Sequence, residues 1–324
     1  VLSGFLIGTM MIRSFECSSN WTDCVKDFWL RRWFRTVPAY YLFIFINYLL
    51  VIYQLTEEPF EYRTIFFTQN LYEPEKTFFF SEAWSLALDE WFYLIMPIIL
   101  GLLSLVLPLG SKKSFLIASS LLIVCPLLAR VAISDGFNFA QWDAAVRRVT
   151  IYHLDATGWG VLAAVLNKWY PSWWQLNIER KLNAGMVLMF IGTCGSAYLV
   201  KIGAEYKLLG NWISILSITL MSSGTLLILP WLSQSFQNSG ASNWFIKTIS
   251  LYSYSIYLCH IPTIIITKHL FEINQSTSFI KLTFVIILCL IMVFLVSSLI
   301  FHFFEKPITD LRERFTKKVI ATPF

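Results

Sequence analysis

The chain has 324 residues, of which 56% are hydrophobic and 14% charged, with a formal net charge of +5. An average soluble domain is about 25% charged, so the composition excludes an ordinary globular protein. Each membrane-spanning helix takes about 20 apolar residues, and the hydrophobic residues suffice for about nine spans. No linker rich in glycine, serine or proline divides them. We therefore predict an all-α, polytopic membrane helical bundle that forms a single domain over residues 1–324.

In chain order, the apolar segments that we predict to be spans lie at residues 1–15, 36–55, 83–108, 114–134, 151–167, 184–201, 211–232, 249–272 and 279–304. Basic residues are concentrated in alternate loops, and the positive-inside rule places those loops and a C-terminal tail, residues 305–324, in the cytoplasm. An odd number of spans then puts Val1 outside. The chain also opens with neither an initiator methionine nor a basic leader. We therefore expect it to begin within a longer protein, after a truncated first helix.

The charge and cysteine patterns predict neither a nucleic-acid partner nor a metal site. Basic residues are scattered among apolar blocks rather than gathered on one face or arm, as nucleic-acid binding would require. Four of the six cysteines lie inside apolar runs, where they act as small hydrophobic residues. Cys17 and Cys24 are the two that could pair. Their gap is wider than typical zinc spacing, and no histidine lies nearby.

Polar residues are most concentrated in the segment Trp84-Ser-Leu-Ala-Leu-Asp-Glu-Trp-Phe-Tyr93. Ser85, Asp89 and Tyr93 recur every four residues and share one helix face, and Glu90 lies one position round from Asp89. Two adjacent carboxylates inside a span repel each other unless one is protonated or paired. The segment therefore fits either proton transfer or a structural ion pair.

Histidines mark three further segments. Tyr257 and His260 lie on one stripe of a predicted helix, where a histidine either packs as a hydrogen-bonded residue or shuttles protons near neutral pH. His153 and Asp155 open the fifth apolar segment. At the end of the last segment, His302 and Glu305 precede Lys306, so Glu305 can form an interfacial ion pair there.

A basic run, Arg31-Arg-Trp-Phe-Arg35, precedes Pro38 at the start of the second apolar segment. Arg32 and Arg35 are three residues apart, so a helix presents them on one face. Guanidinium groups bind phosphate oxygens bidentately, which predicts a seat for a phosphorylated cytosolic ligand. The alternative is that the run only sets the orientation of the membrane helix.

Taken together, these segments resemble the acyltransferase 3 family of integral membrane acyltransferases over essentially the whole chain. The segments that carry the resemblance are Val1–Ile7 with Ser3-Gly4, Arg31–Tyr40, Trp84–Tyr93, His153-Leu-Asp155 with Gly160, Leu251–His260 with Pro262, and Phe304-Glu-Lys-Pro307. The resemblance implies a bundle of about ten helices that transfers an acyl group, usually acetyl from acetyl-CoA, to a hydroxyl of a carbohydrate or lipid-linked sugar. It also implies a general-base histidine in a helix upstream of Val1.

Roles for the residues of this chain follow from the resemblance and from the chemistry. A hydroxyl that attacks a thioester must lose a proton, and Glu90, Asp89 and His260 are the candidates to accept, relay or orient it. The developing oxyanion needs hydrogen-bond donors, for which the candidates are Ser3, Tyr93 and Tyr257. By resemblance, Arg32 and Arg35 hold the phosphates of coenzyme A. The remaining polar pocket is predicted to include Trp84, Ser85, His153 and Asp155.

Two other interpretations compete with an enzyme. A transporter or flippase of an amphipathic solute would also line a path with polar residues in the membrane, although we detect neither inverted repeats nor pairs of broken helices. A catalytically silent relative is the third interpretation, because the usual base is absent from this chain. For a bacterial source we expect the inner membrane as location and an envelope polysaccharide as acceptor.

Overall fold

The computed structural model describes residues 1–17, 21–106, 110–133, 139–202, 207–235, 243–274 and 278–312. Every regular element in these ranges is a helix, as the composition predicts. The chain divides into two compact units. The first contains Val1–Cys24, Phe67–Glu75 and Trp84–Ser239, and the second contains Val25–Phe66, Lys76–Ala83 and Gly240–Phe324. Each unit is described by itself below.

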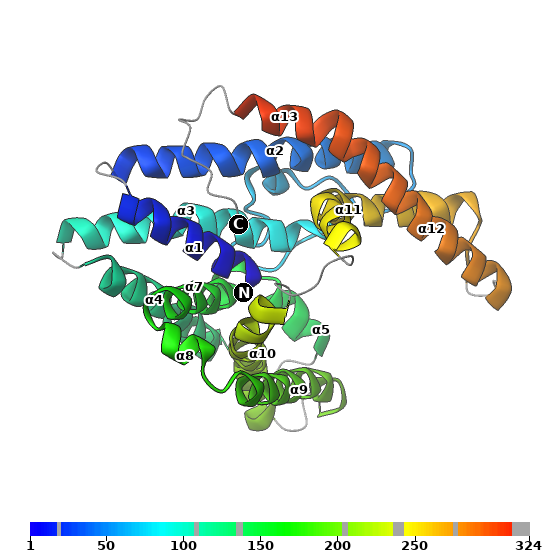
Figure 1. Ribbon diagram of the computed structural model, residues 1–324. Helices are drawn as coiled ribbons and strands as arrows, with labels where there is room; N and C mark the ends of the chain where they lie inside the picture. The colour runs from blue at the N-terminus through cyan, green and yellow to red at the C-terminus, as the bar shows by residue number, and fades with distance from the viewer. Residues whose placement is uncertain are drawn as a thin grey trace. The chain divides into compact units, whose positions relative to one another are not determined.

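The first unit is a group of packed helices around two glycine-rich crossings (Figure 1). Its elements are α1 (Leu2–Cys17), α3 (Ala83–Val106), α4 (Ser111–Ile133), α5 (Phe139–Trp142), the π-helical turn η2 (Asp143–Arg147), α6 (Thr150–His153), α7 (Asp155–Trp169), α8 (Pro171–Gln175), α9 (Ile178–Ile202) and α10 (Lys207–Ser235). The chain bends by 90° between Ala140–Arg147 and Thr150–Trp169.

The helix crossings explain why glycines lie where they do. A Cβ on Gly4 of α1 would overlap the backbone of Thr157 in α7, and one on Gly160 would lie 2.6 Å from the amide nitrogen of Phe5. Gly185 of α9 and Gly224 of α10 approach each other in the same way, with 2.7 Å from either Cβ to the other's carbonyl oxygen. Small residues at such crossings let membrane helices pack closely without a side chain between them.

The second unit contains α2 (Trp21–Ile52) from Val25 onward, the short 3-10 helix η1 (Tyr62–Phe66), α11 (Asn243–Leu270), α12 (Phe279–Ile300), the π-helical turn η4 (Phe301–Glu305) and α13 (Lys306–Leu311). Tyr40 of α2 is fully buried and donates a hydrogen bond of 2.8 Å to the carbonyl oxygen of Thr64, while its ring packs on Phe80. The loop around Phe80 is thereby fixed to α2.

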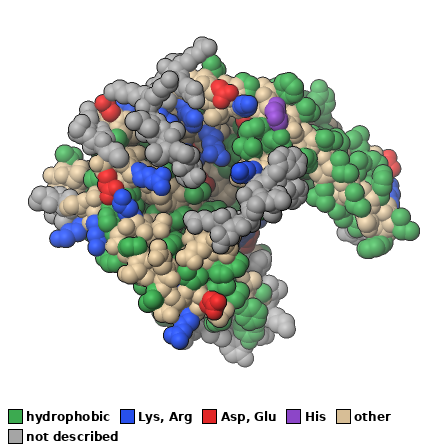
Figure 2. Space-filling model, viewed as in Figure 1, with side chains coloured by type: hydrophobic (Ala, Val, Ile, Leu, Met, Phe, Trp, Pro, Cys, Tyr) green, Lys and Arg blue, Asp and Glu red, His purple; other side chains and the backbone are tan. Residues whose placement is uncertain are grey.

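Hydrophobic side chains cover most of the exposed surface of α12 (Figure 2). Phe279, Phe284 and Leu290 are 82%, 60% and 66% exposed. An exposed apolar surface of this extent is unfavourable in water but favourable against lipid chains, so α12 has the surface of a membrane span.

Within the described residues, six helices are long and apolar enough to cross a membrane, or seven if the bent pair counts as one span. The six lie at Trp21–Ile52, Ala83–Val106, Ser111–Ile133, Gly210–Ser235, Ile246–Leu270 and Phe279–Leu311. The expected count of about nine spans is not confirmed. One physical reason is that the first predicted segment forms α1, whose 16 residues are shorter than the roughly 20 that a span needs.

Several helices extend beyond the predicted apolar segments, most of all α2 and the last helix. Helix α2 begins at Trp21 rather than near residue 36, so the whole basic run lies within one continuous helix. The last helix continues through η4 and α13 to Leu311. The predicted tail over residues 305–324 therefore begins as helix, and its residues 313–324 lie outside the described part of the chain.

Candidate functional site

The polar face of α3 meets α1 in the first unit. Ser3 donates a hydrogen bond of 2.9 Å from its hydroxyl to Oδ1 of Asp89, which joins two candidates that lie 86 residues apart. Tyr93, one turn further along α3, is buried, and Ser85 and Glu90 are half-buried. The structure therefore brings the Ser-Gly segment to the carboxylate that the sequence singled out.

The loop over residues 67–71 lies along α3 and supports its start. The side-chain amide of Asn70 donates to the carbonyl oxygens of Trp84 (3.1 Å) and Arg148 (2.6 Å). Trp91 donates from its indole nitrogen to the carbonyl oxygen of Phe67 at 2.8 Å. Because Asn70 is fully buried, these bonds tie the beginning of α3 to the bend after η2. Sequence reasoning missed Asn70, since a single asparagine in a loop carries no distinctive spacing.

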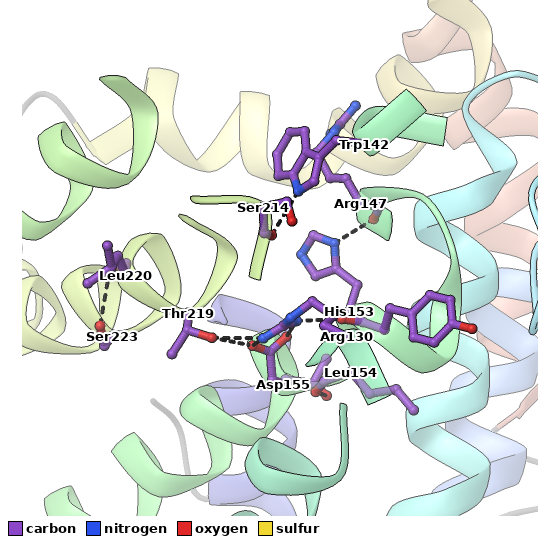
Figure 3. Close-up of polar contacts among 12 residues, drawn as sticks. Arg130, Trp142, Arg147, His153, Leu154, Asp155, Ser214, Thr219, Leu220 and Ser223 are labelled. Carbon is purple, nitrogen blue, oxygen red and sulfur yellow. Dashed lines mark hydrogen bonds and ion pairs between the residues drawn. The ribbon is translucent and has the colours of Figure 1, made fainter. Parts of the chain in front are cut away.

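Asp155 does not stand alone in the membrane domain, because Arg130 of α4 pairs with it (Figure 3). Both side chains are fully buried, and the two guanidinium nitrogens lie 3.0 and 2.7 Å from the two carboxylate oxygens. Arg130 also donates to the hydroxyl of Thr219 in α10 at 2.7 Å and to the carbonyl oxygen of Tyr152. Sequence reasoning missed Arg130. Its signal was available, since an arginine inside an apolar segment requires a partner.

His153 lies beside this ion pair, at the bend. Its Nδ1 is 2.6 Å from the carbonyl oxygen of Arg147. Its imidazole lies 6.1 Å, between ring centroids, from Trp84, whose ring also carries the Arg147 guanidinium at 4.8 Å. Asp143 forms ion pairs with Arg147 and, at 2.8 Å, with Arg148. Trp84, predicted from one segment, thus belongs to the same region as His153 and Asp155, predicted from another.

The candidates of the second unit gather around α11. Tyr257 donates from its hydroxyl to the carbonyl oxygen of Glu82 at 2.9 Å, and its ring lies 5.7 Å from that of His260. The Nδ1 of His260 is 2.6 Å from the carbonyl oxygen of Tyr257, within the same helix. Tyr257 and His260 are therefore neighbours, as their spacing predicts.

The basic run and the C-terminal Phe-Glu-Lys-Pro segment also belong to the second unit. Tyr254 donates to the carbonyl oxygen of Thr36 at 2.8 Å, which attaches α11 to α2 next to Arg35. Ser255 donates to Oε1 of Glu305 at 2.5 Å, and a Coulombic interaction links Glu305 with Arg35. Glu305 thus accepts a hydrogen bond from α11, which the sequence did not predict. The ion pair with Lys306 stays a prediction.

The three arginines of the basic run differ in their surroundings. Arg31 forms an ion pair of 2.6 Å with Asp27, one turn earlier in α2. Arg32 is half-buried and Arg35 is exposed. Because Arg35 is exposed and positively charged, it can contact an anionic ligand. Phosphate binding by Arg32 and Arg35 therefore stays a prediction.

Glu82, immediately before α3, is a buried carboxyl group that sequence reasoning missed. Its side chain is 5% exposed, and Ser81 donates to Oε2 at 3.2 Å. Burial raises the pKa of Glu82 from 4.5 to about 7, because desolvation disfavours the charged form. A carboxyl group that titrates near neutral pH can exchange a proton under cellular conditions.

Of the two cysteines that could pair, Cys17 has a side chain outside the described part of the chain. Cys24 is a free thiol, and its Sγ lies 3.5 Å from the carbonyl oxygen of Ser14.

Comparisons with known proteins agree with the segments described above. The family model described as an acyltransferase domain, Acyl_transf_3, matches residues 1–302. The Bacillus subtilis (strain 168) protein named "Putative peptidoglycan O-acetyltransferase YrhL" is 26% identical over 330 residues, 95% of this chain and 49% of that protein. "Peptidoglycan O-acetyltransferase OatA" of Listeria monocytogenes is 26% identical over 353 residues, 95% of this chain and 50% of that protein.

The chain thus spans about half the length of these curated relatives. No solved structure matches it. The family model covers nearly the whole chain and includes α1, α2, α3, α6, α7 and α11, which carry the candidate residues. With its apolar helices, the chain is a multi-pass membrane protein, and it belongs to the acyltransferase 3 family.

Proposed function

We propose that this chain is the membrane acyltransferase domain of an O-acetyltransferase, which moves acetyl from acetyl-CoA to a hydroxyl of a cell-envelope carbohydrate. The observation that carries the proposal is the match of the acyltransferase 3 model to residues 1–302. The hydrogen bond between Ser3 and Asp89 supports it, because it joins two motifs of that family at one polar helix face. The names of the two relatives favour peptidoglycan as the acceptor.

In this proposal the donor binds through its phosphates. Arg32 and Arg35, three residues apart on α2, supply guanidinium groups for the phosphates of coenzyme A. The attacking hydroxyl then forms a bond to the thioester carbonyl carbon, the carbon–sulfur bond breaks, and the hydroxyl proton leaves with the coenzyme A thiol. Glu90, Asp89 and His260 are the groups of this chain proposed to hold or relay that proton, and Tyr93, Ser3 and Tyr257 are the proposed donors to the oxyanion. For the last two, donation requires that the hydroxyls first release Asp89 and the carbonyl oxygen of Glu82.

The donor is proposed to enter from the cytosolic side of the bacterial inner membrane, where the positive-inside rule places the basic run and the C-terminus. Labelling of a single cysteine at position 32 with a membrane-impermeant maleimide tests this orientation. Labelling of inverted vesicles but not of intact cells supports it. Labelling of intact cells contradicts it.

The activity itself is tested with membranes that contain the full reading frame and radiolabelled acetyl-CoA, with label followed into extracted glycans. We expect transfer by the wild type, loss of transfer in Arg32→Ala/Arg35→Ala, and a reduction in Glu90→Gln. The control Lys113→Ala/Arg180→Ala also removes two positive charges, both at exposed positions, and this variant should transfer acetyl normally. A folded wild type that neither binds acetyl-CoA nor transfers label would contradict the proposal and favour a transporter or a silent relative.

A further inference from the structure

The 90° bend between Ala140–Arg147 and Thr150–Trp169 interrupts a helix inside a membrane domain. Backbone groups freed by such a break must find other partners in the protein, because lipid supplies none. Here the amide nitrogens of Thr150 and Ile151 donate to the carbonyl oxygens of Asn70 and Leu71 at 2.8 and 3.1 Å. The bend is therefore built into the fold by bonds to a separate segment.

The Arg130–Asp155 ion pair lies directly beside the bend (Figure 3). Arg130 is 1% exposed and Asp155 is fully buried. Through Thr219 and the carbonyl oxygen of Tyr152, the pair connects α4, α7 and α10 with the residue that precedes His153. A buried ion pair seldom adds stability over apolar side chains of similar size, so stability alone does not account for it.

Three side chains project together at this bend: Trp84 of α3, Arg147 of η2 and His153 of α6, which we call the bend cluster. The carbonyl oxygen of Arg147 can only accept a hydrogen bond, so Nδ1 of His153 carries the hydrogen. The lone pair of the neutral ring then lies on Nε2. His153 is half-buried as a residue, whereas Asp155 is fully buried.

The chemistry of the bend cluster suits a hydroxyl-bearing ring. Nε2 of His153 can accept a hydrogen bond from a hydroxyl, and the indole of Trp84 lies beside it at 6.1 Å between ring centroids. Aromatic rings of this kind pack against the apolar faces of other rings. The guanidinium of Arg147 lies over the same indole and is held by Asp143, which keeps the ring in place.

We propose that the bend cluster binds the sugar acceptor, with a substrate hydroxyl donating to Nε2 of His153, and that Arg130 and Asp155 are positioning residues that hold His153 there. This inference rests on the proposed function, which it deepens by assigning the acceptor site. Arg130 and Asp155 act through the backbone of Tyr152 and the bend, and touch no substrate themselves.

The first test changes the histidine. His153→Phe keeps a ring but removes Nε2, together with the Nδ1 that bonds to the carbonyl oxygen of Arg147. We expect the KM for a soluble peptidoglycan glycan fragment to rise about tenfold, the usual cost of one hydrogen bond. The KM for acetyl-CoA should stay unchanged. His153→Gln, whose amide oxygen can accept, should retain part of the affinity. His269→Phe, at an exposed position, is the matched control. Equal KM values for the acceptor in wild type and His153→Phe would overturn the assignment.

The second test separates positioning from stability. Arg130→Met leaves Asp155 as an unpaired buried charge, and we expect it to lower the melting temperature strongly. Arg130→Met/Asp155→Leu removes both charges and should restore the melting temperature. If the ion pair positions His153, the KM for the acceptor should stay above the wild-type value in this double variant, while the KM for acetyl-CoA should equal the wild-type value. A double variant with wild-type KM values would show that the pair is only structural.

Binding without turnover distinguishes this inference from the proposed function. Calorimetric titration of the purified protein with the same glycan fragment needs no acetyl-CoA. Binding by the wild type and about tenfold weaker binding by His153→Phe support the acceptor site even if no acetyl transfer occurs. Absence of binding by the folded wild type overturns the acceptor site, whether or not acetyl-CoA is hydrolysed.

Discussion

Ser3 and Asp89, from segments far apart in the chain, form a hydrogen-bonded pair. Ser3 donates to Oδ1 of Asp89 at 2.9 Å, so the hydroxyl fixes the carboxylate on the polar face of α3. A hydrogen bond to a charged group contributes about 1.5–3 kcal/mol. The effect of losing it depends on whether Ser3 acts through Asp89 or on the substrate directly.

We predict that Ser3→Ala lowers acetyl transfer about tenfold, the loss that corresponds to roughly 1.4 kcal/mol. In an Asp89→Ala background the same change should have little further effect, because the partner is already gone. The double-mutant cycle is measured as kcat/KM for acetyl transfer. Additive losses would instead mean that Ser3 acts independently of Asp89.

Glu82 makes stability depend on pH. Its pKa is about 7 in the folded protein against 4.5 in the unfolded chain, since burial disfavours the carboxylate. The folded state therefore binds the proton more tightly, and the free energy of unfolding falls as pH rises from 4.5 to about 7. Below 4.5 this contribution is fully present, and above about 7 it is lost.

We predict that Glu82→Gln flattens this decline, which amounts to about 3 kcal/mol at 1.36 kcal/mol per pKa unit. The thermal unfolding midpoint of detergent-solubilised protein, measured at pH 5 and pH 8, checks it. The exposed Glu179→Gln serves as control and should keep the wild-type slope. An unchanged slope in Glu82→Gln would contradict the assignment to Glu82.

The sequence did not predict Arg130 as the partner of Asp155. Spacing along a helix predicted that Tyr257 and His260 are neighbours, and their rings lie 5.7 Å apart, because neighbours within one helix follow from its period. The partner of Asp155 lies on another helix, 25 residues away, and depends on how α4 packs against α7. The partners of Ser3 and Glu305 were hidden for the same reason.

At the scale of elements, glycines determine how closely helices approach. Gly4 and Gly160 let α1 and α7 cross with their backbones in contact. The sequence predicted the helices themselves from apolar runs, but their crossings and their true ends were not predictable from hydrophobicity alone. Helix α2, for example, includes the polar residues from Trp21 onward that precede its apolar part.

We predict that Gly160→Ala lowers the melting temperature, because its Cβ would lie 2.6 Å from the backbone nitrogen of Phe5 and would force α1 away. Gly195→Ala in α9 is the matched control, since the nearest atom to its Cβ, on Ile213, lies at an ordinary contact distance of 3.4 Å. Alanine there should be neutral or stabilising by up to about 1 kcal/mol. Equal melting temperatures for the two variants would contradict a tight crossing.

At the scale of the whole molecule, the apolar surface requires a lipid environment. The composition predicted a polytopic helical membrane protein, and the helices confirm that class. The number of spans was not predictable from hydrophobicity, because an apolar block can form a short helix such as α1, or only one arm of a bent pair such as Ala140–Arg147 with Thr150–Trp169.

We predict that Leu290→Arg, at a position of α12 that is 66% exposed, reduces the fraction of protein that resists carbonate extraction from membranes. An arginine at the centre of a span costs about 2.5–3.5 kcal/mol on insertion scales. Tyr72→Arg, 62% exposed in a loop, should have no such effect. If the two variants remain equally membrane-bound, α12 does not face lipid at that position.

The π-helical turn Phe301–Glu305 also has a consequence for comparing this chain with its relatives. Such a turn is equivalent to one residue inserted into an α-helix. The wider turn takes up the extra residue, so the helix beyond it keeps nearly the orientation of the helix before it. If the turn instead adopted α-helical geometry with no residue removed, everything beyond it would rotate by about 100°, the angle per residue of an α-helix. Glu305 would then turn away from Ser255. An alignment that closes a one-residue gap in this segment would therefore pair residues that face different directions.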